Sequence, residues 1–290
     1  MASLTTVIGL VGSVAVATLS FNDTFAAYPS HRTASKSVVS TTPGKANVVR
    51  VIGEDFKFDA PDVIPAGLTE FRFLNKGPAL HHMAILKLED GKTFGDVQAA
   101  LAHPGPVPAW IKEVGGPNAP DAGMESNATV MLDPGNYVLI CFVDIGGPPH
   151  FMKGMVKALR VIPSTGVVAS APNVDATATL FDYNFTISSP IHAGTRTIRV
   201  VNSAKQHHEV ELVQLAAGAS LGDFMKWMEK MDGPPPGKAL GGVAGMDPGM
   251  SQYFTADFVA GNYALLCFLP DAKDGKPHFV HGMAKQIAVN

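Results

Sequence analysis

Residues 134–155 read PGNYVLICFVDIGGPPHFMKGM, and residues 261–283 read GNYALLCFLPDAKDGKPHFVHGM. Both stretches contain Tyr-x3-Cys, a loop, Pro-His, and then Gly-Met directly before an apolar segment that ends its half of the chain. Eight residues separate cysteine from histidine in the first copy and ten in the second, and four residues separate histidine from methionine in both. A thiol, an imidazole and a thioether therefore share one loop in each half. These residues are Cys141, His150 and Met155, and then Cys267, His278 and Met283.

The two stretches are part of a longer internal repeat. The paired histidines at 81–82 recur at 207–208, and the whole set repeats with an offset of 126 to 128 residues. Solenoid repeats are only ~20–50 residues long, so this offset indicates tandem domains. We predict a first domain at residues 47–162 and a second at 177–290. The linker between them, at 163–176, is rich in Pro, Ser, Gly and Ala.

The N-terminus has features of an export signal. An apolar run at residues 7–19 precedes the small residues Ala26 and Ala27, although the first basic residue is Arg32. We predict a cleaved signal peptide at 1–27 and a flexible lead-in at 28–46. A membrane anchor is the alternative, but a span needs about 20 apolar residues. Cleavage would give a periplasmic or extracellular protein without a stable membrane span.

Composition favours an all-β protein. Charged residues make up 16% of the chain, against a usual ~25%, and the chain holds 29 Gly and 22 Pro. One helix is expected in each half, at 93–101 and at 220–231, where Ser220 is a suitable N-cap. The remaining pattern predicts two β-sandwiches. The expected strands are 48–58, 69–74, 83–88, 128–132, 136–142 and 155–162, then 178–187, 195–201, 209–215, 251–258, 262–268 and 283–289. The net charge of −3 offers no basic face to nucleic acid.

The repeated side chains are typical of a copper site. With one upstream histidine, each half supplies two imidazoles, one thiolate and one thioether, which is the ligand set of a trigonal His2Cys copper centre with a weak axial Met. Thiolate and thioether favour Cu(I), and imidazole accepts either oxidation state. We predict two copper sites, with the ligands His82, Cys141, His150 and Met155 in the first half and His208, Cys267, His278 and Met283 in the second.

The choice between the paired histidines follows from strand alternation. If His208 points inward, Val210 and Leu212 do so too, while Glu209 and Glu211 face water. The opposite register would bury both carboxylates. The second ligand is therefore expected to be His208 and, by the repeat, the first to be His82. His81 and His207 are then expected at the surface or behind the ligands.

Other interpretations of these residues remain open. A buried Cys beside a buried His is also ordinary core packing, and a duplicated site can lose its metal. A Cys141–Cys267 disulfide is disfavoured, because equivalent positions in two cores should lie beyond the ~7 Å Cα limit. Methionines at helical spacing, Met225, Met228 and Met231, fit core or interface packing better than a Cu(I)-transfer patch.

The repeated pattern resembles a known family. Residues 134–157 resemble the copper loop and last strand of plastocyanin-type cupredoxins, and residues 73–77 resemble the strand that leads to the first ligand. The resemblance covers nearly all of 47–162 and 177–290. It implies a Greek-key β-sandwich, a type 1 copper in each domain and outer-sphere electron transfer. The Cys-to-His loop is longer than in plastocyanin or azurin, and in the first half its length is similar to that of copper nitrite reductases. Met83 and Glu209 replace the Asn or Ser that commonly follows the upstream His.

The resemblance also bears on catalysis. In copper nitrite reductases and multicopper oxidases, histidines beside the type 1 Cys bind a neighbouring copper centre. Here Ile140 and Leu266 precede the cysteines, Phe142 and Phe268 follow them, and the sequence has no His-x-His pair. We therefore expect an electron carrier, not an enzyme, with a redox partner such as a c-type cytochrome. The alternatives are a nitrite-reductase-like or oxidase-like protein with a copper centre at a subunit interface, and a copper storage or delivery protein.

Overall fold

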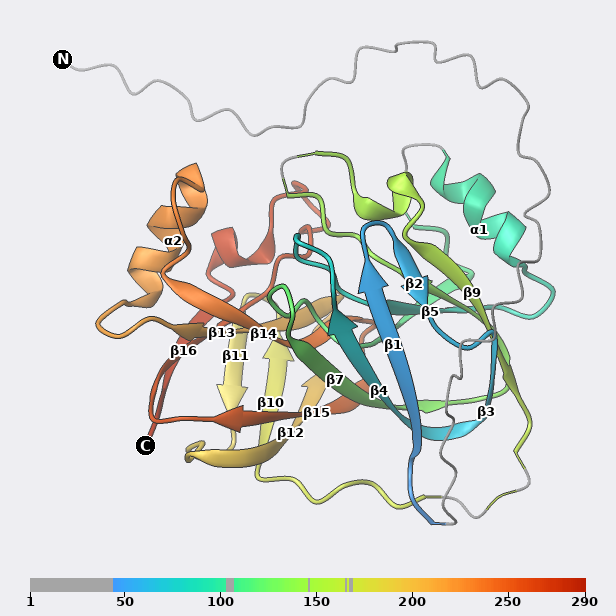
Figure 1. Ribbon diagram of the computed structural model, residues 1–290, viewed down its shortest axis with the longest axis horizontal. Coiled ribbons are helices and arrows are strands. Elements are labelled where there is room, and N and C mark those ends of the chain that lie inside the picture. Colours follow the sequence, from blue (N-terminus) through green and yellow to red (C-terminus); the bar gives the residue numbers. More distant parts are fainter. Residues whose placement is uncertain (1–43, 103–106, 146, 165, 167–168) are drawn as a thin grey trace, which may run out of the picture. The chain divides into compact units, whose positions relative to one another are not determined.

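The computed structural model describes residues 44–102, 107–145, 147–164, 166 and 169–290 (Figure 1). The predicted signal peptide at 1–27 and most of the lead-in at 28–46 lie outside the described residues. In the described part of the chain, no helix is long and apolar enough to cross a bilayer.

Within the described residues, the first half has nine strands, one α-helix and one 3-10 turn. These are β1 (Asn47–Glu54), β2 (Lys57–Asp59), β3 (Val63–Pro65), β4 (Gly67–Asn75), β5 (Ala84–Leu88), α1 (Phe94–Leu101), β6 (Ile111–Gly115), β7 (Glu125–Leu132), β8 (Gly135–Ile140), the 3-10 turn His150–Lys153 and β9 (Val156–Ile162).

The second half repeats this order without a counterpart of β3. Its elements are β10 (Ala176–Phe181), β11 (Asn184–Ile187), β12 (Gly194–Asn202), β13 (His208–Leu215), α2 (Leu221–Lys230), β14 (Gly237–Met246), β15 (Ser251–Phe258), β16 (Gly261–Leu266), the 3-10 turn His278–His281 and β17 (Ala284–Val289). The all-β prediction with one helix per half is confirmed. The sequence did not indicate β3, β6 or β14, and the runs at 48–58 and 178–187 are each divided by a tight turn into two paired strands.

Each half is a β-sandwich, and the two sandwiches share both of their sheets. One sheet has the order β11-β10-β12-β15-β7-β4-β1-β2, and the other β17-β16-β13-β14-β6-β5-β8-β9-β3. The first sheet crosses between halves where Tyr253 pairs with Thr129, and the second where Met246 pairs with Val114. Residues from the two halves therefore meet directly, in addition to being joined by the linker.

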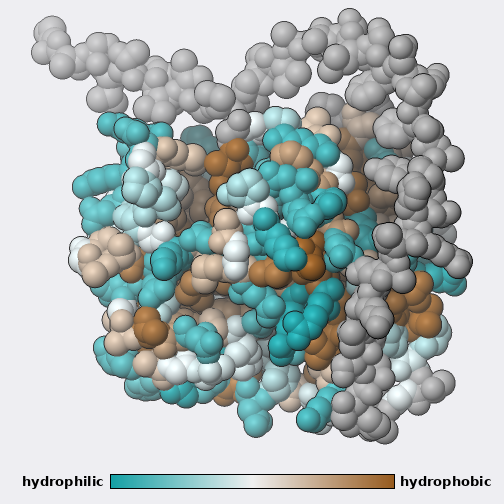
Figure 2. All heavy atoms as spheres, in the orientation of Figure 1, coloured by the Kyte–Doolittle hydropathy of each residue, from teal (hydrophilic) through white to brown (hydrophobic). Residues whose placement is uncertain are grey.

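Apolar side chains fill the space between the sheets in each half. Phe71, Phe73 and Ile85 belong to the core of the first sandwich, and Phe185 and Leu212 to that of the second. The helices cover the outer face of the second sheet: Val97 of α1 packs with residues of β5 and β8, and Phe224 of α2 with residues of β13 and β16. On the face shown in Figure 2, hydrophilic side chains are interspersed with smaller hydrophobic areas.

Local hydrogen bonds explain where the helices begin and where the strands that lead to the two cysteines begin. Thr93 and Ser220 each form a capping box with the Asp three residues later, which pairs backbone donors that a helix start leaves free. Before β8 and β16, the Tyr137 hydroxyl donates to the Asp133 carbonyl at 2.9 Å, and the Tyr263 hydroxyl to the Val259 carbonyl at 3.0 Å. In both halves, therefore, the same tyrosine hydrogen bond closes the turn before the strand that leads to the cysteine.

Candidate metal centres

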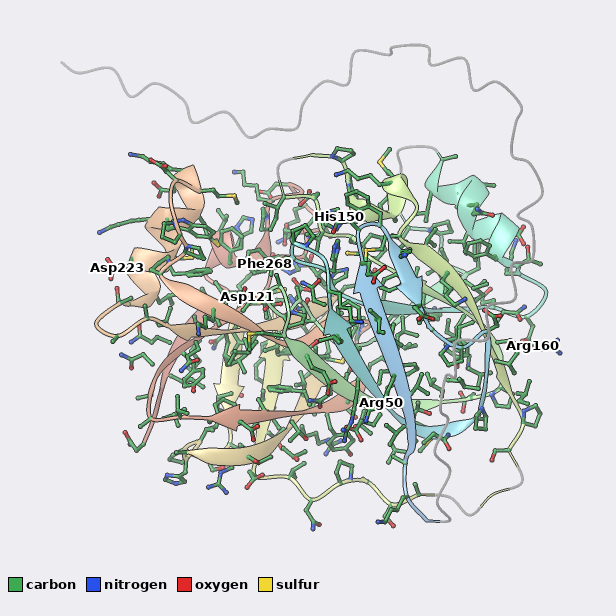
Figure 3. The ribbon with its side chains drawn as sticks, viewed as in Figure 1. Arg50, Asp121, His150, Arg160, Asp223 and Phe268 are labelled. Carbon is green, nitrogen blue, oxygen red and sulfur yellow. The ribbon has the colours of Figure 1, made fainter. Side chains whose placement is uncertain are left out.

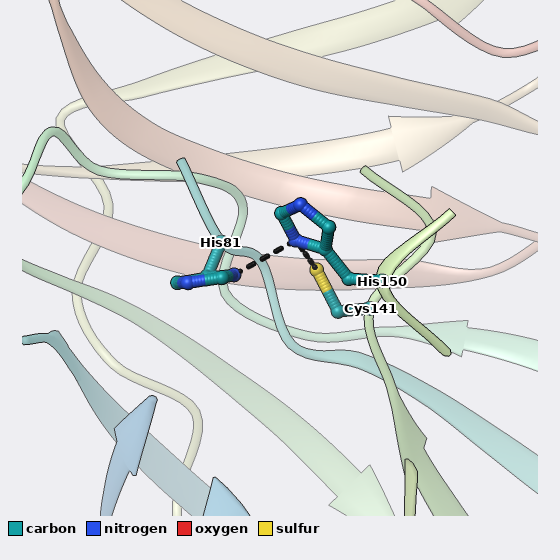
Figure 4. A group of neighbouring side chains, drawn as sticks. All are labelled: His81, Cys141 and His150. Atoms are coloured by element: carbon teal, nitrogen blue, oxygen red, sulfur yellow. Dashed lines mark hydrogen bonds between the residues drawn. The ribbon is translucent and has the colours of Figure 1, made fainter. Parts of the chain in front are cut away.

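In the first half, three buried side chains converge at one end of the sandwich. Cys141 directly follows β8, His150 opens the 3-10 turn after Pro149, and His81 lies between β4 and β5 (Figure 4). The Nδ1 atoms of His81 and His150 are 2.9 Å apart, and the Cys141 sulfur is 3.6 Å from His150 Nδ1. Figure 3 places His150 near the tip of β1.

The second half contains the same arrangement. The Cys267 sulfur lies 3.7 Å from His208 Nδ1 and 3.4 Å from His278 Nδ1, and all three residues are buried. In both clusters the three potential ligand atoms lie within 4.8 Å of one another. Each cluster can therefore present two imidazole nitrogens and one sulfur to a single metal ion.

The two loop methionines are bonded to their clusters through the backbone. Met155 donates its N–H to the His150 carbonyl at 3.0 Å and accepts from the Cys141 N–H at 3.1 Å. Met283 makes the same bonds to His278 and Cys267, at 3.0 and 3.2 Å. Both side chains are fully buried in the core that contains the cysteine. Their role as axial ligands stays a prediction.

The structure corrects the upstream residue of the first half, because His81 and not His82 joins the cluster. His82 points to the other side, where its Nε2 accepts the Phe142 N–H at 2.8 Å. Burial lowers the pKa of His82 to about 4, which keeps the ring neutral.

The error comes from aligning the histidine pairs with each other. Asn75 and Asn202 make the same bonds in their halves, each donating at 2.9 Å to the carbonyl four residues later. The cluster histidine lies six residues after this Asn in both halves, at His81 and His208. Counting from the Asn would have identified His81.

The strand argument for His208 also needs a correction. His208 does lie in the cluster, but Glu209 and Glu211 are buried, at 4% and 6% exposure, and do not face water. The first half of the chain covers this face: Asn118 donates to Glu209 at 3.2 Å and the Ala119 N–H to Glu211 at 3.2 Å. His207 is partly exposed, 3.3 Å from both Glu113 and Asp247.

This burial predicts a pH-dependent gain in stability for Glu211→Gln. Burial and the nearby Glu209 raise the pKa of Glu211, and its Oε1 has no hydrogen-bond partner among the described residues. The unfolded chain loses this proton near pH ~4.3, while the folded chain keeps it to higher pH, so Glu211 lowers stability as pH rises. Glu211→Gln should raise the free energy of unfolding by about 1 kcal/mol or more at pH 8 and by little at pH 4.

Denaturant unfolding at the two pH values measures this difference. The exposed Glu229→Gln in α2 is the matched control, and it should change stability little at either pH. An equal effect of Glu211→Gln at pH 4 and pH 8 would contradict the burial argument.

Two carboxylates that the sequence reasoning missed orient the upstream histidines. Asp55 accepts from His81 Nε2 at 2.6 Å, and Asp182 from His208 Nε2 at 3.0 Å. With the proton held on Nε2, the lone pair of Nδ1 faces the cluster, as a metal ligand requires. Asp55 and Asp182 are 127 residues apart, the same interval as His81 and His208.

The surroundings of the loop histidines His150 and His278 differ between the two clusters. In the second, His278 Nε2 lies 3.4 Å from Gln206 and 3.7 Å from Asp271. In the first, the Phe56 ring packs edge-on against His150, with ring centroids 4.9 Å apart. The loop histidine of the second cluster thus has polar partners in addition to the edge-on ring of Tyr183, whose centroid is 5.8 Å away.

The donor set fits copper. Two imidazoles and a thiolate suit a soft transition metal and do not suit Mg²⁺ or Ca²⁺, which take oxygen ligands. Burial raises the pKa of the Cys141 thiol to about 11 and also raises that of Cys267, so metal binding has to release the thiol proton.

Two other histidines of the described residues, His192 and His281, are not members of these clusters. His281 lies 3.1 Å from Asp274 and, with Asp271, forms a third group that could hold an ion, although His281 and Asp274 are exposed. The His192 carbonyl accepts from Arg196 at 3.1 Å. His103 lies outside the described residues.

Comparisons with known proteins give low similarity throughout. No family model and no curated protein matches the chain. A dithionite-reduced auracyanin from Roseiflexus castenholzii is 20% identical, covering 39% of this chain and 94% of its own, with a TM-score of 0.29. A multicopper oxidase is 11% identical over 88% of this chain and 93% of its own, also at 0.29. A copper-containing nitrite reductase from Thermus scotoductus is 11% identical over 84% of this chain and 61% of its own, at 0.24.

The strand topology and the clusters lead to one conclusion about architecture. Each half is a two-sheet sandwich in which the cysteine follows one strand, a histidine opens the next turn and a methionine precedes the following strand. The described chain therefore consists of two β-sandwich halves with shared sheets, and each half carries one buried cluster of two histidines and a cysteine.

Proposed function

We propose that the protein binds one copper ion in each cluster and carries single electrons between other redox proteins. The observation that supports this proposal is the duplicated convergence of two Nδ1 atoms and one cysteine sulfur in a buried site. Copper, when bound, would supply a one-electron couple between Cu(I) and Cu(II). The finer assignment, a type 1 site in each domain with an axial Met, is part of the proposal.

The protein's contribution would be to hold the ligands still. Cys141 and Cys267 follow strands, and backbone bonds from the methionines close each loop around the cluster. Asp55 and Asp182 fix the orientation of the upstream rings. A site that moves little when copper changes oxidation state favours rapid electron transfer, and its buried position keeps water from the metal.

The surroundings of the cysteines support a carrier more than an enzyme. Phe142 and Phe268 follow the cysteines, and their N–H groups bond to His82 and Glu209. A copper with two imidazoles, a thiolate and a thioether has no open position for a substrate. The export signal expected at residues 1–27 would place this carrier in the periplasm or outside the cell, where c-type cytochromes are suitable partners.

A copper titration followed by visible absorption tests the proposal. Two equivalents of copper per chain and an intense thiolate-to-copper band would support it. A third, non-blue copper would favour the enzyme alternative. Tight colourless Cu(I) without a reversible couple would favour storage or delivery, and either of these results would contradict the carrier.

A second measurement concerns turnover. Reduced, copper-loaded protein should reduce an oxidised c-type cytochrome quickly, and it should not sustain reduction of nitrite or oxidation of phenols, since a copper with four protein ligands would have no open position for a substrate. Stopped-flow absorption measures the reduction of the cytochrome, and nitrite assays measure turnover. Multi-turnover nitrite reduction would show that a catalytic copper had been missed.

A further inference from the structure

A line of hydrogen bonds crosses the interface between the two halves and ends beside both cysteines. On one side, the N–H of Phe142, next to Cys141, donates to His82 Nε2 at 2.8 Å. On the other, the N–H of Phe268, next to Cys267, donates to Glu209 Oε1 at 2.9 Å. His82 and Glu209 are equivalent in the repeat, because each directly follows the upstream histidine of its cluster.

Asn118 connects these two acceptors. Its Nδ2 donates to Glu209 Oε2 at 3.2 Å, and its side chain also interacts with the His82 ring. Asn118 is held in place by its own backbone, since its N–H donates to the Gly242 carbonyl at 3.2 Å and its carbonyl accepts from Ser126 at 2.7 Å. Three side chains, through three hydrogen bonds and the interaction between Asn118 and His82, therefore link the peptide after Cys141 to the peptide after Cys267.

The composition of this link is unusual for a domain interface. His82, Asn118 and Glu209 are 7%, 3% and 4% exposed. Burial of an imidazole, an amide and a carboxyl costs free energy that apolar residues would not cost, even where hydrogen bonds offset part of it. The N–H groups of Phe142 and Phe268 each require one hydrogen-bond acceptor. Two separate acceptors, not connected to each other, would be sufficient for this. The Asn118 side chain interacts with both acceptors, His82 and Glu209.

We propose that His82, Asn118 and Glu209 form a path that carries an electron between the two copper sites, from one cysteine to the other. This inference rests on the proposed copper binding. One electron would leave the reduced site, which would thereby be oxidised, and enter the oxidised site, which would thereby be reduced. No covalent bond breaks and no proton is released. An external one-electron donor and acceptor, each a redox protein, would load and empty the pair.

The metal-free protein tests the geometry of the path. Because His82 Nε2 accepts a hydrogen bond, the neutral ring has to carry its proton on Nδ1. Nitrogen-15 NMR of the metal-free chain should show this tautomer, and Asn118→Leu should shift the signals of both the His82 ring and the Phe268 amide. A proton on Nε2 would overturn the proposal, because an N–H cannot accept from Phe142.

The copper-loaded protein tests transfer itself. After a reducing pulse of less than one electron per molecule, the thiolate-to-copper absorption bands of the two sites should relax in a first-order phase. The rate of this phase should not depend on protein concentration. Asn118→Leu should slow this phase by about tenfold, which corresponds to about 1.4 kcal/mol in the barrier, because it removes the polar contacts that join His82 to Glu209. Asn118→Ala is the second variant, in case the leucine disturbs folding.

Asn127→Leu is the matched control. Asn127 also joins the two halves, donating to the Thr255 carbonyl at 2.6 Å and accepting from the Thr255 N–H at 2.8 Å, but it lies in the other sheet. It should leave the rate unchanged. Intact bands with an unchanged rate in Asn118→Leu would overturn the path and leave copper binding standing, whereas a wild-type chain without bands would refute the proposed function.

Discussion

Cys141→Ser and Cys267→Ser are each expected to remove about half of the copper-dependent visible absorption, and the double variant all of it. The band requires a thiolate, and the two sulfurs at 3.4 to 3.7 Å from their histidine nitrogens are the only cysteines in the chain. A serine hydroxyl is close in shape to the thiol but is a harder donor with a much higher pKa, so it cannot replace the thiolate. Absorption spectra recorded during a copper titration measure the loss.

The two single variants serve as controls for each other. Each should retain one equivalent of copper and the spectrum of the intact half, because the clusters lie in separate cores. Subtracting the remaining spectrum from that of the wild type assigns a band to each site. Full colour in the double variant, or complete loss in one single variant, would show that the sites are not independent thiolate centres.

The sequence predicted the parts of the site that are local in the chain. Cys141, His150 and Met155 lie within 15 consecutive residues, and a strand followed by a short turn can bring such neighbours together without distant contacts. The helices were also predictable, because Ser220 and the residues after it carry their own capping signals. Duplication strengthened both inferences.

Residues whose environment depends on the other half could not be placed in the same way. Glu209 and Glu211 lie on the outer face of β13, which would face water if each sandwich stood alone. In this chain β14 pairs with β6, and Asn118 and Ala119 of the first half cover that face. Strand alternation predicts which residues share a face, but it does not predict what covers that face.

The oriented carboxylates show a different limit. Asp55 and Asp182 precede their histidines by 26 residues, in the turn that follows the first strand of each half. Nothing in the local sequence marks an Asp in a turn as a partner of a distant imidazole. The only signal in the sequence is that Asp55 and Asp182 are 127 residues apart, as are His81 and His208. Aligning the pair at 81–82 with the pair at 207–208 gives an offset of 126 residues and hides this match.

The corrected assignment of the upstream ligand leads to a paired experiment with opposite expected results. His81→Ala should abolish the band of the first site, and His208→Ala that of the second, because each removes an Nδ1 from a buried cluster. His82→Gln should leave the first band nearly intact. Its amide oxygen can still accept the Phe142 N–H, so the variant keeps the backbone bond while removing the imidazole.

The second half provides the internal check on this result. At the position equivalent to His82 the chain carries Glu209, which accepts the Phe268 N–H through an oxygen, so an imidazole is not needed there. His207→Ala, at a partly exposed side chain bonded to Glu113, should likewise leave the second band in place. Copper-loaded spectra of the four variants, with unfolding measured in parallel, separate loss of a ligand from loss of the fold. If His82→Gln bleached the first site while His81→Ala kept its colour, the ring that binds metal would be the one facing Asn118, and both the site and the path between the sites would have to be reassigned.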